Sequence, residues 1–261
     1  CVTSNNRKVV VNELKKDKTG YYIMDLEDLE KKITPKTKIL ALCSPHNPVG
    51  RVWSKEELEK IANICIKHNI IIVSDEIHSD ITFKKFTPLA SISKEIANQT
   101  ITLNSAGKTF NIAGLNSAYA ISKNQKILDK FKKIAQKREI QSINFFGYVS
   151  TKAAYDNGAL FVEELKKYLL SNIEFTKNYL KKNNSKIDFK PPEATYLLWL
   201  DFSRYNLSHN EIKNILLTKS KIALNDGVSF GNNGNGYFRL NLALSQNSLE
   251  IALSQLSKEF L

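Results

Sequence analysis

The sequence predicts an α/β fold, with a three-layer α-β-α large domain followed by a smaller α+β domain. In the first half of the chain, short apolar runs alternate with helical patterns. These runs are continuous, which is typical of a mostly parallel sheet covered by helices on both faces. Long helical patterns and shorter strand patterns follow in the second half. We place the domain boundary near residue 158, so that the predicted domains span residues 1–158 and 159–261.

The expected elements follow from apolar periodicity and helix caps. Helices are expected at residues 25–33, 54–69, 124–138, 143–157, 159–183, 208–220 and 247–261, and strands at 38–44, 70–75, 100–106, 117–122, 195–202, 221–226 and 237–244. Asp25 is the expected cap of the first helix, and the capping box Ser54-x-x-Glu57 begins the second. The helix at 159–183 would be about 37 Å long, which is enough to bridge two domains.

The composition limits the classes of partner. Basic residues outnumber acidic residues by 38 to 26, giving a net charge of +12, which favours anionic partners in general. Most lysines lie in helical segments mixed with glutamate, a pattern typical of a solvated helix face rather than of a nucleic-acid or lipid surface. Apolar runs such as residues 70–73 are far shorter than a membrane span. We therefore expect a soluble globular protein with a small-molecule partner.

The cysteines and histidines do not predict a metal site. Cys43 and Cys65 lie in apolar periodic segments, where small buried thiols are expected, and Cys1 makes the number of cysteines odd. Both features favour a reducing cytoplasm. A metal site needs about four clustered ligands. The histidines are instead scattered along the chain, at His46, His68, His78 and His209.

Polar residues with catalytic potential lie where the predicted strands end. Ligands of open parallel sheets bind at the carboxyl ends of the strands, and the sequence places Asn47, Asp75, Ser105 and Lys108 there. A buried Asp75 would need a cationic or hydrogen-bonding partner. The alternative for Asp75 is a turn cap, and the alternative for Asn47 is a structural role in the turn that contains a proline and a glycine. Arg239 interrupts an apolar strand, so its charge is expected to face an anion or a carboxylate.

Lys108 is the one charged residue in the stretch TLNSAGKTFNIAGL, residues 102–115. A desolvated pocket or a neighbouring cation lowers the pKa of a lysine until its amine can attack carbonyls, so apolar neighbours suggest a nucleophile. The alternative is a lysine that extends from a loop into solvent. Ser105 and Lys108 also match the Ser-x-x-Lys motif of penicillin-recognising enzymes, but the Ser-Asp-Asn element of those enzymes is absent.

Taken together, these residues resemble the class I and II aminotransferase superfamily, the fold type I enzymes that use pyridoxal 5'-phosphate (PLP). Four separated motifs occur in the family's order: NPVG at 47–50, SDEIH at 74–78, SAGK at 105–108 and YFRLNLA at 237–243. The resemblance extends over practically the whole chain. It implies a PLP-binding large domain, a small C-terminal domain, an amino-acid substrate and a homodimer.

The resemblance also implies a role for each residue. Lys108 would hold PLP covalently and remove the α-proton of the substrate, and Asp75 would keep the pyridine nitrogen protonated. Asn47 would donate a hydrogen bond to the phenolic oxygen of PLP, and Ser105 would contact its phosphate. Arg239, with Asn47 beside it, would bind the substrate α-carboxylate through its two-pronged guanidinium.

Within the superfamily, the stretches CSPHNPVGRVWSKEEL and SDEIHSDI are most similar to the cystathionine β-lyase-type carbon-sulfur lyases. His78 stands where aminotransferases usually place a tyrosine beside the cofactor, and Asn116 stands where many of them place a phosphate-binding arginine. The implied reaction is α,β-elimination of an S-substituted L-cysteine to a thiol, pyruvate and ammonia. An aminotransferase, a non-catalytic regulatory relative and a non-functional fragment remain alternatives.

The beginning of the chain departs from the family pattern. The start, CVTSNNRKVVV, has neither a methionine nor the apolar core of a signal peptide, which suggests an interior piece of a longer chain. Members of the family have roughly a further third of chain before this point. We therefore expect an incomplete large domain with an exposed apolar sheet edge, weak or absent PLP binding, and no turnover by this piece alone.

Overall fold

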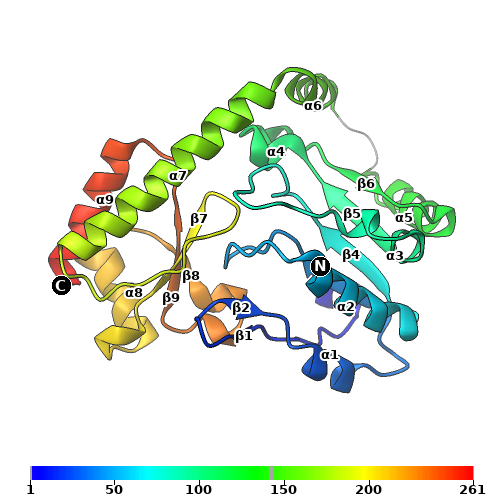
Figure 1. The fold of residues 1–261 in the computed structure, drawn as a ribbon. Coiled ribbons are helices and arrows are strands. Elements are labelled where there is room, and N and C mark those ends of the chain that lie inside the picture. The colour runs from blue at the N-terminus through cyan, green and yellow to red at the C-terminus, as the bar shows by residue number, and fades with distance from the viewer. Residues whose placement is uncertain (1, 141–143, 261) are drawn as a thin grey trace.

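The computed structural model describes residues 2–140 and 144–260. Figure 1 shows two lobes, each built on its own sheet, with the long helix α7 (Ala159–Lys182) running across both. Cys1, the first residue of the helix predicted at 143–157 and the last residue of the helix predicted at 247–261 lie outside the described residues. The mixed α/β fold with a mostly parallel sheet, expected from the sequence, is confirmed.

The larger sheet has the strand order β3-β4-β5-β6. Its strands are β3 (Ile39–Cys43), β4 (Ile71–Asp75), β5 (Thr100–Asn104) and β6 (Tyr119–Ile121). The first three run parallel, and β6 pairs antiparallel with β5. The strand expected at 100–106 ends earlier, because the chain turns at Ser105 into the single-turn helix α4 (Ala106–Thr109).

Except for α3 (Lys94–Gln99), which was not expected from the sequence, the other helices of the first lobe are close to their expected bounds. They are α1 (Leu26–Lys32), α2 (Lys55–Lys67), α3 (Lys94–Gln99), α5 (Gln125–Lys137) and α6 (Phe145–Asn157). The expected caps are confirmed: Asp28 N–H donates to the side chain of Asp25, and Ser54 and Glu57 form both hydrogen bonds of a capping box. A short hairpin of β1 (Lys15–Lys16) and β2 (Tyr22–Ile23) was not expected from the sequence.

Burial of the larger sheet differs from the expectation of helices covering both faces. Residues alternate along β4, where Ile72 and Ser74 are buried, Ile71 and Val73 are half-buried and Asp75 is exposed. The covered face packs on one apolar core with residues of α2, including Leu58 and Cys65. At the sheet edges, Ile39 on β3 is 60% exposed and Ile121 on β6 is 58% exposed, so the expected exposed apolar edge is present.

The second lobe is built on the antiparallel sheet β7-β9-β8. Its elements are β7 (Leu197–Asp201), α8 (His209–Thr218), β8 (Asn225–Asp226), β9 (Tyr237–Asn241) and α9 (Gln246–Glu259). Together with α7 these elements form a second apolar core, in which Phe202 and Phe238 are fully buried. Gly158 lies at the break between α6 and α7. The domain boundary near this residue remains a prediction.

A buried carboxylate joins the two halves of the chain. Glu193 is 8% exposed, and its Oε2 accepts hydrogen bonds from Arg51 Nε and from the backbone N–H of Val52, both at 2.9 Å. Lys84 pairs with its other oxygen. Burial alone would raise the pKa of Glu193, but the hydrogen bonds from Lys84 and Val52 and the charge of Arg51 outweigh burial and hold the pKa below its usual range.

We expect Glu193→Gln to lower the free energy of unfolding by about 1.5–3 kcal/mol at pH 7, because charged hydrogen bonds are lost. A carboxyl group whose pKa is depressed by folding stabilises the protein above its unfolded pKa, roughly 4.3, and loses this contribution as the pH falls through the folded value. The gap between the two proteins should therefore shrink as the pH falls from about 6 to about 3. Urea unfolding across this range measures the gap.

The matched control is Glu59→Gln, which removes only a 3.5 Å helix-surface pair with Lys55 and should change stability by less than about 0.5 kcal/mol. A gap between wild type and Glu193→Gln that is constant from pH 7 to pH 3 would contradict the assignment of charged hydrogen bonds to Glu193.

Candidate functional site

The candidate residues of the first lobe lie at the carboxyl ends of the parallel strands. Cys43 at the end of β3 pairs in register with Asp75 at the end of β4, and Asp75 pairs with Leu103 of β5. Asn47 follows β3 and Lys108 follows β5. The topology therefore brings these segments to one edge of the sheet, as expected for an open parallel sheet.

Lys108 lies on α4, a single helical turn held by Ser105. The hydroxyl oxygen of Ser105 accepts a hydrogen bond from Gly107 N–H at 2.9 Å, and the hydroxyl donates to the carbonyl oxygen of Ser117. Ala106 and Thr109 are buried on either side of Lys108, whereas the Lys108 side chain is exposed. The expected desolvation of the amine is therefore absent, because the tight turn packs its small residues inward and leaves the lysine pointing away from them.

A hollow of about 270 Å³ lies at this turn. It is lined by Ile77, Ser105, Gly107, Lys108, Ala113, Asn116, Ser117 and Ala118. Asn116, for which the resemblance implies the position of a phosphate-binding arginine, is therefore part of the same wall as Lys108. The hollow gives the amine an open space beside the end of the sheet.

Two side-chain hydrogen bonds fix the lysine segment against the loop that follows Asp75. Asn104 Nδ2 donates to Ser79 Oγ at 3.0 Å, and Thr109 Oγ1 donates to Asp80 Oδ2 at 2.9 Å. Because they lie on both sides of Lys108, they hold its backbone in place relative to the end of β4. These pairs were not predicted from the sequence: Ser79 and Asp80 belong to the stretch SDEIHSDI, but that stretch does not indicate which side chains they contact.

Asp75 is exposed, so the expectation of a buried carboxylate is wrong. Its Oδ1 accepts a hydrogen bond from the backbone N–H of Ile77 at 3.2 Å, which is the turn-capping role left open as an alternative. The physical reason is its position: Asp75 is the last residue of β4, where the side chain leaves the covered face of the sheet. The carboxylate is therefore available to a ligand at this edge.

His78 is buried, with 3% of its surface exposed, and its ring lies edge-on to the Tyr196 ring with centroids 5.7 Å apart. Within the described residues, its Nδ1 has no hydrogen-bond partner. Burial lowers the pKa of His78 to about 4, with further lowering by the charges of Lys108 and Arg239. The imidazole is therefore neutral near pH 7.

Arg239 connects the second lobe to Asn47. Its Nη1 donates to Asn47 Oδ1 at 2.7 Å, and its Nη2 donates to Asn225 Oδ1 at 2.8 Å. The guanidinium lies over the Phe230 ring, 4.9 Å from the ring centroid. In the part of the chain that the structure describes, Arg239 Nε is buried without a hydrogen-bond partner and the guanidinium forms no ion pair with a carboxylate. Arg239 is thus a cation held by neutral groups, which suits an anionic ligand.

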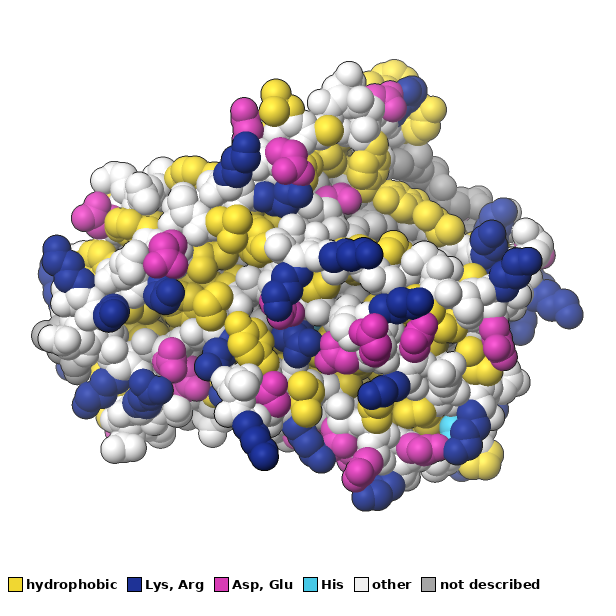
Figure 2. Space-filling view, in the orientation of Figure 1, with side chains coloured by type: hydrophobic (Ala, Val, Ile, Leu, Met, Phe, Trp, Pro, Cys, Tyr) yellow, Lys and Arg dark blue, Asp and Glu magenta, His cyan; other side chains and the backbone are white. Residues whose placement is uncertain are grey.

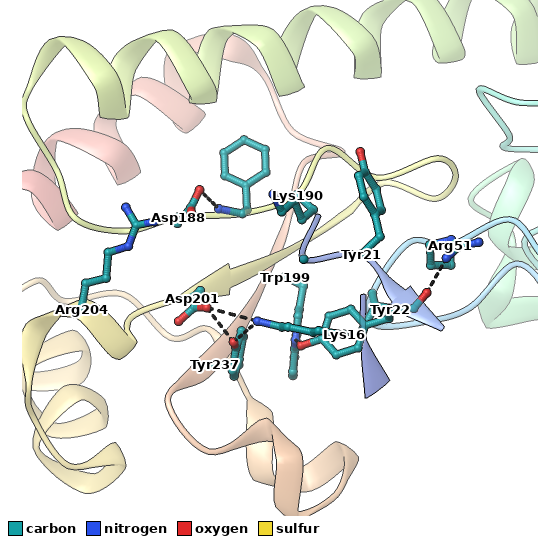
Figure 3. A pocket seen from close by; sticks show the side chains of 13 residues that line it. Lys16, Tyr21, Tyr22, Arg51, Asp188, Lys190, Trp199, Asp201, Arg204 and Tyr237 are labelled. Atoms are coloured by element: carbon teal, nitrogen blue, oxygen red, sulfur yellow. Dashed lines mark hydrogen bonds and ion pairs between the residues drawn. The ribbon is translucent and has the colours of Figure 1, made fainter. Parts of the chain in front are cut away.

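A second hollow, of about 220 Å³, lies between the β1–β2 hairpin and the small sheet (Figure 3). Lys16 is one of the residues that line it, with Nζ 4.9 Å from the Tyr237 ring centroid and 5.4 Å from that of Tyr22. Tyr237 donates to Asp201 at 2.6 Å and stacks on Trp199, with the ring planes inclined by 9°. Lys16 on the hairpin therefore lies against the aromatic rings of this hollow, and its hydrogen bond to Tyr237 joins the hairpin to the small sheet.

Apart from these two hollows, the described residues contain no metal-binding cluster and no membrane-spanning helix. On the face shown in Figure 2, lysines and arginines are interspersed with aspartates and glutamates. Residues 2–140 and 144–260 contain no cluster of three or more histidine, cysteine or acidic side chains placed to bind a metal ion. No helix within these ranges is both long enough and apolar enough to span a membrane.

Comparisons with known proteins define the class. Residues 3–256 match the family described as aminotransferase class I and II, and the chain belongs to this family. Cystathionine beta-lyase PatB of Bacillus subtilis (strain 168) is 38% identical over 98% of this chain and 66% of its own length. Protein MalY of Escherichia coli (strain K12) is 31% identical over 96% of this chain and 64% of its own length. The chain thus spans just under two thirds of these relatives.

Solved structures give the same class. Cystalysin from Treponema denticola, which contains PLP, has a TM-score of 0.95 and 33% identity, covering 99% of this chain and 66% of that one. A PLP-bound protein of Clostridium difficile 630, assigned as an aminotransferase, has a TM-score of 0.95 and 48% identity. The match covers 98% of this chain and 66% of that one. The fold is therefore that of the PLP enzymes of fold type I.

Proposed function

We propose that the full-length protein to which this chain belongs is a PLP-dependent carbon-sulfur β-lyase. It would convert an S-substituted L-cysteine, such as cystathionine, to a thiol, pyruvate and ammonia. The similarity to PatB and to cystalysin supports this class of reaction. The proposal includes a homodimer and a reducing location such as the cytoplasm, where Cys43 and Cys65 would stay free thiols.

The observation that carries the proposal is the state of Arg239. Its guanidinium donates no hydrogen bond to a carboxylate of the described chain, and its buried Nε–H has no acceptor there. An unpaired buried donor is costly, and a carboxylate ligand would satisfy it. The α-carboxylate of an amino acid fits this requirement, and Asn47 is already bonded to the same guanidinium.

The residues at the sheet edge are suited to PLP. When bound, PLP withdraws electrons from the α-carbon of the substrate. The exposed amine of Lys108 would attach to the cofactor and then move the α-proton, and the exposed carboxylate of Asp75 would keep a proton on the pyridine nitrogen. Asn47 accepts from Arg239 through Oδ1, which leaves its Nδ2 hydrogens free to donate to the phenolic oxygen of PLP.

Two further residues would complete the cofactor site. Ser105 would contact the phosphate, for which its hydroxyl would have to turn away from the Ser117 carbonyl. His78 would lie beside the pyridine ring of PLP as a neutral imidazole, and its free Nδ1 supports this role. A neutral histidine at this position favours a lyase over an aminotransferase, which usually has a tyrosine there. The similarity to the Clostridium difficile protein supports the aminotransferase as the second candidate.

The test is pyruvate release by the full-length protein with added PLP and L-cystathionine, in the absence of any 2-oxo acid. We expect sustained release of pyruvate and ammonia in equal amounts, measured by coupled reduction of pyruvate to lactate. An aminotransferase would instead release neither pyruvate nor ammonia, and would consume only about one L-cystathionine per cofactor until a 2-oxo acid is added. That second outcome would reject the lyase. Light scattering of the same sample tests the proposed dimer.

A further inference from the structure

We propose that Asn225 is a positioning residue that keeps Arg239 open to an anionic ligand by holding it with a neutral oxygen. The inference deepens the proposed function, because it rests on Arg239 as the site of the substrate carboxylate. It assigns a specificity role to an amide that lies outside the four motifs of the family resemblance. The role depends on the absence of charge at residue 225 and not only on the shape of its side chain.

The strand pairing fixes the position of Asn225. Asn225 of β8 lies in register opposite Arg239 of β9, and Arg239 lies opposite Trp199 of β7. The three side chains therefore project from the same face of the small sheet. Phe230 packs beside them: its ring is nearly perpendicular to the Trp199 ring, with centroids 5.6 Å apart, and the guanidinium lies over it. The guanidinium can thus move little without losing the Asn225 hydrogen bond.

A carboxylate stands next to Asn225 but is directed elsewhere. Asp226 Oδ1 lies 2.8 Å from His209 Nε2, and Asp226 Oδ2 lies 2.8 Å from Lys213 Nζ. Successive residues of a strand point to opposite faces, so this negative charge is turned away from Arg239. β8 therefore presents the Asn225 amide to Arg239 and the Asp226 carboxylate to His209 and Lys213.

The chemistry of the guanidinium explains why the neutral partner matters. Of its five N–H groups, one donates to Asn47 and one to Asn225. Amide oxygens hold the group in place and leave its full positive charge uncompensated. An aspartate at position 225 would offer an oxygen in nearly the same place, but it would form an internal ion pair that competes with a ligand carboxylate.

The decisive comparison is Asn225→Asp against Asn225→Ala, with Arg239→Lys as a reference. We expect the KM of the PLP-loaded full-length protein for L-cystathionine to rise roughly 10- to 100-fold in Asn225→Asp, and by less than roughly 10-fold in Asn225→Ala, with a smaller change in kcat. A purely structural role would give the reverse order, because aspartate has the shape of asparagine and alanine has not.

A second measurement does not depend on turnover. The N–H signal of Arg239 Nε, identified by its loss in Arg239→Lys, is followed by NMR during titration of the PLP-free protein with sodium acetate. We expect acetate to shift this signal in wild type and, more weakly, in Asn225→Ala, and to leave it unmoved over the same range in Asn225→Asp.

The outcomes separate this inference from the proposed function. If Asn225→Asp binds acetate and L-cystathionine as wild type does, or loses less affinity than Asn225→Ala, the role of the neutral amide is rejected. If Arg239→Lys itself leaves the KM unchanged, the carboxylate site assumed in the proposed function is rejected as well. Cofactor attachment at Lys108, measured on the same proteins, should be intact in every variant.

Discussion

Lys108→Ala is expected to lower elimination by the full-length protein by at least roughly 10²–10⁴-fold, the range for loss of a positioned acid–base group. Lys108 is the lysine among the residues that line the hollow beside the sheet edge. In the proposed function, its loss would remove both the attachment of PLP and the base for the α-proton. Pyruvate release measures the rate. Reduction with borohydride followed by peptide mass mapping measures attachment of the cofactor to residue 108.

The matched control is Lys123→Ala, at an exposed lysine between β6 and α5. We expect wild-type rates and unchanged labelling of residue 108 in this protein. If Lys108→Ala retained the rate, or if borohydride fixed the cofactor equally to many surface lysines of wild type, Lys108 would be an ordinary surface lysine. The alternative of a lysine that extends into solvent would then hold.

Asp75→Asn is expected to lower elimination roughly 10²–10³-fold, comparable to the loss of one preorganised electrostatic group at an active site. The substitution removes the negative charge that would hold a proton on the pyridine nitrogen of PLP. It keeps an oxygen that accepts the hydrogen bond from Ile77 N–H, so the turn should be preserved. The steady-state rate and the free energy of unfolding are measured on the same preparation.

The two roles of Asp75 predict the same stability but different elimination rates for this variant. If Asp75 is only a turn cap, both stability and rate stay near wild type, because asparagine caps turns as well as aspartate does. If the charge serves the cofactor, stability changes by less than about 0.5 kcal/mol while the rate falls. Asp75→Glu, which keeps the charge, should retain more activity than Asp75→Asn, and Asp129→Asn on α5 serves as the surface control.

Much of the fold could be predicted because its signals are local. The capping box of Ser54 and Glu57 depends on residues three apart, and the structure contains both of its hydrogen bonds. The apolar period of residues 159–183 gave a helix that lies at Ala159–Lys182. The strand expected at 100–106 was too long, because the sequence SAGK has no apolar period to separate the strand end from a single helical turn.

The candidate site was predictable in its residues but not in its environment. The order of the motifs identified Lys108, Asp75, Asn47 and Arg239, whose roles remain predictions. Apolar neighbours suggested a desolvated amine and a buried carboxylate, and both Lys108 and Asp75 are exposed. Burial depends on which segments pack over a residue, and sequence neighbours do not determine this.

The sequence by itself determined the family, the helix caps and the residue types at the sheet edge, because each follows from short-range hydrogen bonding or from a motif. Only the tertiary structure decided that Arg239 lies between the amide oxygens of Asn47 and Asn225, at sequence separations of 192 and 14 residues. The physical reason is that a charge acquires its partners through the packing of two lobes, and the strand register sets which side chain meets it.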